Sequence, residues 1–177
     1  MKKMSTRMLV EAGIMIALAQ ILSYLKIIEF QNGGSVTLGS MIPILLFAIR
    51  WGSKPGILAG LVYGFLQFAL QTKFSYHPLG IFLDYIFAFG CLGFAGLFRK
   101  NLFTIVASIA VAMAGRFTFH YISGVLLWYM YAPKGTSVYL YSLIYNGSYL
   151  LPEFLISAAL ICALYKPLKR YLVINTI

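Results

Sequence analysis

The residues best suited to chemistry in this chain lie within and just after a long apolar run that begins near residue 102. Arg116, His120, Gly124 and Trp128 follow one another at intervals of four. On a helix each such step turns about 40° beyond a full turn, so the four residues form a slanting stripe on one side. Charge is costly inside a bilayer, and charged side chains there usually face a cavity or a partner. The stripe is suited to a small, flat, polar ligand, with Gly124 leaving room for it.

The same stripe is also compatible with a packed aromatic face that contains a hydrogen-bonded histidine. Further polar groups follow in the tyrosine-rich segment 132–147, which we expect to be a loop that carries Tyr141 and Asn146. Asp84 is the only acid well inside the middle apolar runs. Such a carboxylate needs a basic side chain, a donor network or a cationic ligand, and Arg116 could be its structural partner.

Two other acids allow simpler interpretations. Glu11 lies near the start of the first apolar run, where a carboxylate suits the helix dipole, and we expect it to be structural. Glu153 follows Pro152, which we expect in the first turn of a helix or at a kink. Glu153 could serve the same dipole or border an outer cavity.

Catalytic motifs are absent. The sequence contains no H-E-x-x-H, no G-x-S-x-G and no Walker glycine loop. With two histidines and few acids, we predict that the protein is not an enzyme and needs no cofactor or metal.

The composition is that of an integral membrane protein. Of the 177 residues 61% are hydrophobic and 10% charged, and the mean hydropathy is +0.86, whereas soluble domains are about 25% charged. A spanning helix needs about 20 residues, so six spans occupy most of the chain and form one domain, 1–177. We therefore predict an all-α protein with six transmembrane helices, in apolar runs at roughly Thr6–Ile28, Leu38–Ile49, Pro55–Leu70, Leu79–Phe98, Leu102–Tyr131 and Ser148–Tyr165.

The formal charge of +10 would suggest a nucleic-acid partner in a soluble protein, but here it follows the topology. Cytoplasmic loops of membrane proteins are enriched in Lys and Arg. Both termini are therefore predicted to be cytoplasmic, and the loops 29–37, 71–78 and 132–147 to face outward. On this topology the outer side holds Lys73 and Lys134, and the inner side holds Lys2, Lys3, Arg7, Arg50, Lys54, Arg99, Lys100, Lys166, Lys169 and Arg170.

Small residues indicate close helix packing. Glycines recur every four residues from Gly52 to Gly64, a pattern that lets helices approach closely. Gly13 and Ala17 form a shorter stripe on the first helix, which either packs internally or faces another protein. The two cysteines, Cys91 and Cys162, lie in apolar runs, and no disulfide is expected.

Three segments carry a family resemblance. They are the stretch Leu38–Leu70, with L-G-S-M-I-P-I-L-L-F-A-I-R-W-G-S-K-P-G, the segment H-P-L-G-I-F-L-D-Y-I-F-A-F-G-C-L-G-F-A-G, and Y-A-P-K-G followed by Y-S-L-I-Y-N-G-S. Together with F-H-Y-x-x-G-V they resemble the thiamin-specific substrate-binding subunits, or S components, of energy-coupling factor (ECF) transporters. The similarity extends over nearly the whole chain.

The resemblance implies a six-helix protein of the bacterial cell membrane that binds extracellular thiamin at high affinity. It implies docking on a module of a transmembrane coupling protein and two cytoplasmic ATPases, through Gly13 and Ala17. The implied thiamin-binding residues are Asp84, Tyr85, Arg116, His120, Gly124, Trp128, Tyr141 and Asn146, with Tyr76 a looser match.

The chain departs from this family at two places. Members can carry Glu where Asp84 stands, and some have a tryptophan in the first outer loop, where 31–37 has none. The alternatives are an S component for another vitamin or a thiamin precursor, a stand-alone transporter, and an intramembrane enzyme.

Overall fold

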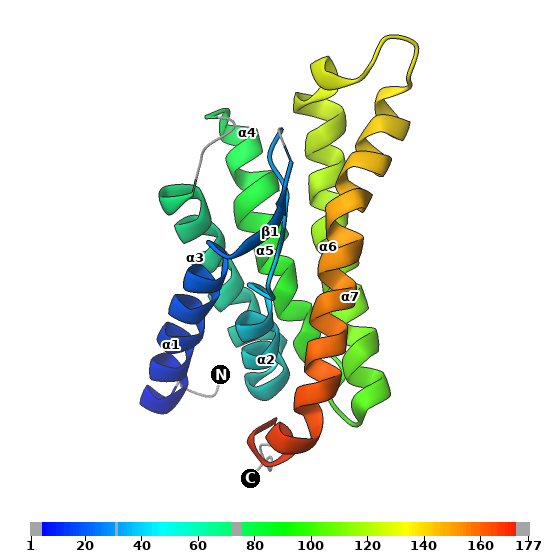
Figure 1. The fold of residues 1–177 in the computed structure, drawn as a ribbon. Helices are drawn as coiled ribbons and strands as arrows, with labels where there is room; N and C mark the ends of the chain where they lie inside the picture. Colours follow the sequence, from blue (N-terminus) through cyan, green and yellow to red (C-terminus); the bar gives the residue numbers. More distant parts are fainter. Residues whose placement is uncertain (1–4, 31, 72–75, 173–177) are drawn as a thin grey trace.

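The computed structural model describes residues 5–30, 32–71 and 76–172. Within them the chain forms six helical segments, as predicted, and one short hairpin (Figure 1). The helices are α1 (Thr6–Leu22), α2 (Ile42–Trp51), α3 (Ser53–Leu70), a compound helix Pro78–Gly96, α6 (Leu102–Leu127) and α7 (Val138–Leu172). The compound helix joins α4 (Pro78–Gly80), a π-helical stretch Ile81–Phe87, α5 (Ala88–Gly90) and a 3-10 stretch Cys91–Gly96.

Successive helices run in opposite directions, so α1 begins and α7 ends at the same end of the molecule (Figure 1). By length and composition, three of the described helices could each cross a membrane: the compound helix, α6 and α7. The predicted second span is the short apolar helix α2, in which nine of ten residues are buried. It is therefore the central element around which the longer helices pack. Pro43 lies in the first turn of α2, where a residue without a backbone N–H is tolerated.

The glycines of α3 pack against the compound helix, as predicted. A Cβ atom at Gly60 would lie 2.3 Å from the carbonyl oxygen of Phe89, and one at Gly64 would lie 2.4 Å from that of Tyr85. The compound helix contributes Gly93, where a Cβ would lie 2.1 Å from the backbone nitrogen of Ile57. Only glycine allows the two backbones to come this close.

The prediction for 29–37 was a loop, but the chain there forms most of an antiparallel hairpin. Strands β1 (Lys26–Glu29) and β2 (Ser35–Thr37) pair Ile28 with Val36. Gly33 and Gly34 make the turn with positive φ, a conformation open to glycine at no steric cost. The hairpin is the one departure from an all-α fold in the described part of the chain.

The prediction that 132–147 is a loop was wrong, because α7 begins at Val138. Its polar side chains bond to the helix itself: Asn146 Nδ2 donates to the Ser142 carbonyl at 2.9 Å, and Ser148 Oγ to the Tyr145 carbonyl at 2.7 Å. Residues that favour turns are thereby accommodated in a helix. Pro152 consequently lies inside α7, and Glu153 is far from any helix start.

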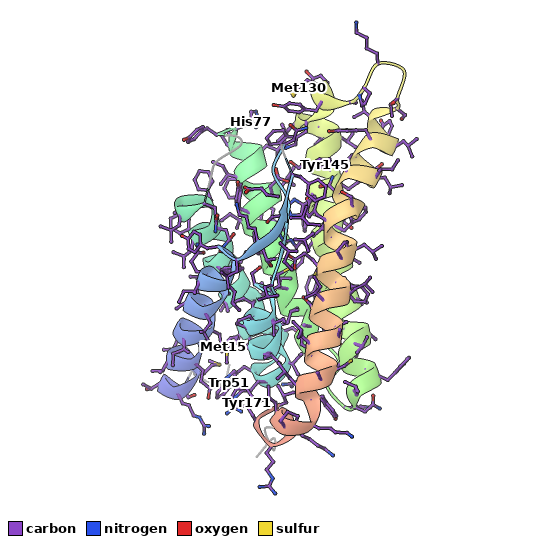
Figure 2. All side chains as sticks on the ribbon, in the orientation of Figure 1. Met15, Trp51, His77, Met130, Tyr145 and Tyr171 are labelled. Atoms are coloured by element: carbon purple, nitrogen blue, oxygen red, sulfur yellow. The ribbon has the colours of Figure 1, made fainter. Side chains whose placement is uncertain are left out.

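An ionic and aromatic cluster joins three elements at the end where α1 begins. Glu11 Oε2 lies 2.8 Å from Arg50 Nε and accepts a hydrogen bond from Trp51 Nε1 at 2.7 Å. The Arg50 guanidinium lies 3.9 Å from the ring centre of Tyr171. Trp51 and Tyr171 lie at the opposite end of the molecule from His77 (Figure 2). Glu11 is therefore structural, as predicted.

Cys91 and Cys162 are free thiols.

Candidate functional site

A cavity of about 160 Å³ lies between the compound helix, α6, α7 and the hairpin. It brings together eight of the nine residues predicted to bind a ligand, namely Asp84, Tyr85, Arg116, His120, Gly124, Trp128, Tyr141 and Asn146. The ninth, Tyr76, is not in the lining; it is 73% exposed and precedes the compound helix, which begins at Pro78.

Asp84 is held by side chains of α6. Its Oδ1 lies 3.1 Å from His120 Nδ1, while its Oδ2 accepts from Ser123 Oγ at 2.6 Å and more weakly from Trp128 Nε1 at 3.4 Å. The hypothesis of a direct Asp84–Arg116 pair is wrong for this structure. Arg116 Nε instead donates to His120 Nε2 at 3.3 Å, which selects the neutral imidazole tautomer with its proton on Nδ1, facing Asp84.

Arg116 is held by soft and aromatic groups. Its guanidinium carbon lies 4.1 Å from the ring centre of Phe89, a cation–π contact, and Nη1 points to the Met41 sulfur. Arg116, His120 and Asp84 thus form a hydrogen-bonded chain along the cavity wall. Both carboxylate oxygens of Asp84 are engaged before any ligand binds.

Gly124 allows α6 and α7 to pack closely beside the cavity. A Cβ at this position would lie 2.2 Å from Ser142 Oγ and 3.1 Å from Asn146 Nδ2. The space beside Gly124 is therefore filled largely by α7 side chains, and the room we expected there for a ligand is small. Asn146 Nδ2 also donates to the His120 carbonyl at 3.3 Å, which fixes α7 against α6 at the cavity.

One wall of the cavity is a ladder of tyrosines on α7. Tyr141 stacks on Tyr145 with ring centres 5.7 Å apart, and Tyr145 meets Tyr149 edge-on at 6.0 Å. Tyr145 points toward the hairpin, and its hydroxyl donates to the Gly33 carbonyl (Figure 2). Phe30 packs edge-on against Tyr145 with ring centres 6.0 Å apart.

The sequence prediction missed Tyr145 and Tyr149, which line the cavity together with Glu153, for which a place at an outer cavity was one of two expectations. The available signal was spacing, because Tyr141, Tyr145, Tyr149 and Glu153 follow at intervals of four and share one side of a helix. That signal has meaning only if the segment is helical, and we expected a loop.

Polar side chains of α1 and α3 complete the lining opposite this wall. Gln67 Nε2 donates to Gln20 Oε1 at 2.8 Å and to Ser23 Oγ at 3.0 Å, and Gln71 Nε2 donates to Ser23 Oγ at 2.8 Å. Ser23, Gln67 and Gln71 face the cavity, so this network connects it directly to α1.

The charges of the lining do not balance. It contains the acids Glu29, Asp84 and Glu153 and the bases Lys26 and Arg116. Lys26 and Glu29 pair with each other in the hairpin, Nζ to Oε1 at 2.6 Å. The lining thus holds one more acidic than basic residue, which suits a ligand with a positive charge.

Comparison with known proteins gives the family of the chain. The family model described as "Thiamine transporter protein" matches residues 9–173. The chain belongs to the thiamine transporter protein family. It is 37% identical, over a 179-residue alignment, to the thiamine transporter ThiT of Bacillus subtilis strain 168, covering 93% of each chain. It is 32% identical over 155 residues to ThiT of Lacticaseibacillus paracasei, covering 78% of this chain and 77% of that one.

Solved structures share the fold of this family member. ThiT from Listeria monocytogenes superposes with a TM-score of 0.84 at 29% identity, covering 93% of this chain and 96% of that one. The S component of a bacterial ECF transporter superposes with a TM-score of 0.66 at 17% identity, covering 94% and 97%. The predicted S-component fold and the predicted family are both confirmed.

Proposed function

We propose that this chain binds thiamin in the cavity and delivers it across the bacterial cell membrane as the S component of an ECF-type transporter. One observation carries the proposal: the lining of the aromatic cavity beneath the hairpin contains three acidic and two basic residues. Thiamin is a flat monocation, built from an aminopyrimidine and a thiazolium ring. Aromatic faces and a carboxylate are the groups that favour such a cation.

The contacts within the cavity suggest a role for each predicted residue. The thiazolium ring lies near Asp84, whose charge is fixed in place by His120 and Ser123. Trp128 and Tyr141 offer ring faces for stacking. His120 and Asn146, whose polar atoms bond within the protein, hold the lining in place. Tyr85 and Arg116 close the wall beside Phe89, and Tyr76 has no part in this assignment.

We further propose that both termini face the cytoplasm and that the cavity opens outward. In the described residues, Arg7, Arg99, Lys100 and Arg170 belong to the end where α1 begins, and Lys134 belongs to the opposite end. This asymmetry follows the positive-inside rule. The predicted cations Lys2, Lys3 and Lys73 lie outside the described residues.

Cysteine labelling tests this orientation. Single cysteines at Ser35, Lys134 and Lys100, in a background with Cys91→Ser and Cys162→Ser, are exposed to an impermeant thiol reagent on intact cells. The outward positions, 35 and 134, should react and position 100 should not. Labelling at 100 alone would reverse the topology.

Energy for transport must come from a partner, because the sequence has no nucleotide-binding motif. The partner is an ECF module, a coupling protein with two ATPases, and we propose α1 as its docking helix. Gly13 and Ala17 are both exposed, and nothing lies within 4 Å of a Cβ built at Gly13. The stripe therefore faces away from the bundle, which supports docking on another protein over internal packing.

Calorimetry on the purified protein tests the ligand. Thiamin should bind at one saturable site, while riboflavin and the isolated pyrimidine precursor, which lack a fixed positive charge, should bind far more weakly. Tighter binding of either neutral compound would favour the alternative, an S component for another vitamin or a thiamin precursor.

A further inference from the structure

A second carboxylate, that of Glu153, lies deep in the same cavity, and the assignments above give it no role. It is on α7, twelve residues beyond Tyr141, which corresponds to about 18 Å along the helix axis. The residue is only 2% exposed, yet it belongs to the cavity lining. An acid this deeply buried needs a reason, since taking a carboxylate out of water is costly.

The two oxygens of Glu153 have different surroundings. Oε1 accepts from the backbone nitrogen of Thr37 at 2.5 Å and from its hydroxyl at 2.7 Å. Oε2 is fully buried and has no hydrogen-bond partner among the described residues. By contrast, both oxygens of Asp84 are already engaged. Glu153 Oε2 is therefore a buried carboxylate oxygen of the cavity lining that can still accept a hydrogen bond.

The hydrogen bonds from Thr37 do not by themselves explain why a carboxylate is buried at this position. A neutral amide in the same place would accept both Thr37 hydrogen bonds through its oxygen, without burying a charge. Arg116 does not supply that reason, because its Nε points to His120 and its Nη1 to Met41. A carboxylate becomes advantageous when a further donor arrives at Oε2, because hydrogen bonds to charged acceptors are stronger than neutral ones.

We propose that Glu153 is a ligand-contacting, specificity-determining residue whose Oε2 accepts a hydrogen bond from a donor group of thiamin. This inference rests on the proposed function. Thiamin has two such groups, the amino group of its pyrimidine ring and its terminal hydroxyl. Because Oε1 holds Thr37 at the end of β2, the same side chain would link the bound ligand to the hairpin above it.

The test is Glu153→Gln, measured by calorimetry with three ligands. Glutamine keeps the shape and the acceptor for Thr37, but it can place an N–H₂ group where Oε2 was. The ligands are thiamin, an analogue with an oxo group in place of the pyrimidine amino group, and an analogue without the terminal hydroxyl. The variant should bind thiamin about tenfold or more weakly than the wild type.

One analogue should be nearly insensitive to the substitution, with affinities for variant and wild type within about twofold. That analogue identifies the donor, since it lacks the group that Oε2 accepts. Loss of the Glu153 charge by itself would weaken the binding of all three ligands equally, because all three carry the same positive ring. Unchanged thiamin binding by the variant, or an equal loss for all three ligands, would overturn the proposal.

Thr37→Val is the matched control. It removes one hydrogen bond to Oε1 without altering Oε2, so any effect should be the same for all three ligands. Thermal unfolding of each ligand-free variant reports folding, and Glu153→Asp replaces the Gln variant if that one does not fold, with the same selective pattern expected. If the wild type itself fails to bind thiamin, the proposed function fails too. If it binds and only the variant pattern is missing, the role of Glu153 alone is wrong.

Discussion

Replacing Asp84 with Asn should remove most of the affinity for thiamin while leaving the protein folded. The substitution changes one oxygen to an N–H₂ group and removes one of the three acids of the cavity lining. The local network can adapt: Asn still offers an acceptor to Ser123, and the neutral imidazole of His120 can change its tautomer. The substitution should therefore lower the affinity for thiamin more than it lowers the stability of the fold.

The size of the affinity loss follows from the burial of the Asp84 carboxylate, which we expect to attract the positive ring of thiamin. Two opposite charges about 4 Å apart attract by about 4 kcal/mol at the effective dielectric of a partly buried site. The side chain of Asp84 is 17% exposed, so this attraction is only partly screened. Removing one partner of such a pair costs about 2–5 kcal/mol, or roughly 30-fold to several thousand-fold in affinity.

The assay is calorimetric titration of thiamin into the purified variant, with thermal unfolding as the check on folding. Ser123→Ala is the control, because it removes one donor to Asp84 and keeps the charge; it should cost only about 1 kcal/mol. An Asp84→Asn protein that is folded and binds thiamin within about threefold of the wild type would refute the reasoning. Asp84 would then be a structural partner of α6.

The remaining predictions concern fluorescence, docking and packing. Thiamin should quench tryptophan emission through Trp128, which lines the cavity, so Trp128→Phe should abolish the quench and Trp51→Phe, at the far end, should preserve it. Gly13→Trp with Ala17→Trp should leave thiamin binding nearly unchanged but abolish uptake and co-purification of the ECF module; lost binding with an intact complex would contradict an outward-facing stripe. Gly93→Ala should lower stability by about 1–3 kcal/mol in thermal unfolding, because the new methyl meets the α3 backbone, whereas Gly13→Ala should not; equal unfolding temperatures for both variants would exclude close packing at Gly93.

The positions of the proposed binding residues on α6 could be predicted from the sequence because they depend on local geometry. Helical spacing places Arg116, His120 and Trp128 on one side of α6 whatever surrounds it, and the structure finds them around one cavity. The membrane setting and the six helices follow from composition for a similar reason, since each apolar run must satisfy its own backbone as a helix.

The pairing of Asp84 could not be predicted in this way. Arg116 and His120 were both within reach on the predicted stripe, and only the packing of the compound helix on α6 selects His120 and Ser123. The exclusion of Tyr76 is likewise a tertiary result, because its distance from the cavity depends on where the compound helix begins.

The sequence by itself determined that this is a membrane protein with small-residue packing faces, a basic end and a polar stripe on its fifth helix, because these features depend on composition and on helical periodicity alone. The tertiary structure decided what lies across from that stripe. α7 starts early, at Val138, and its side that lines the cavity carries Tyr145, Tyr149 and Glu153. The hairpin then brings Thr37 to Glu153, a contact between residues far apart in the chain that no local pattern encodes.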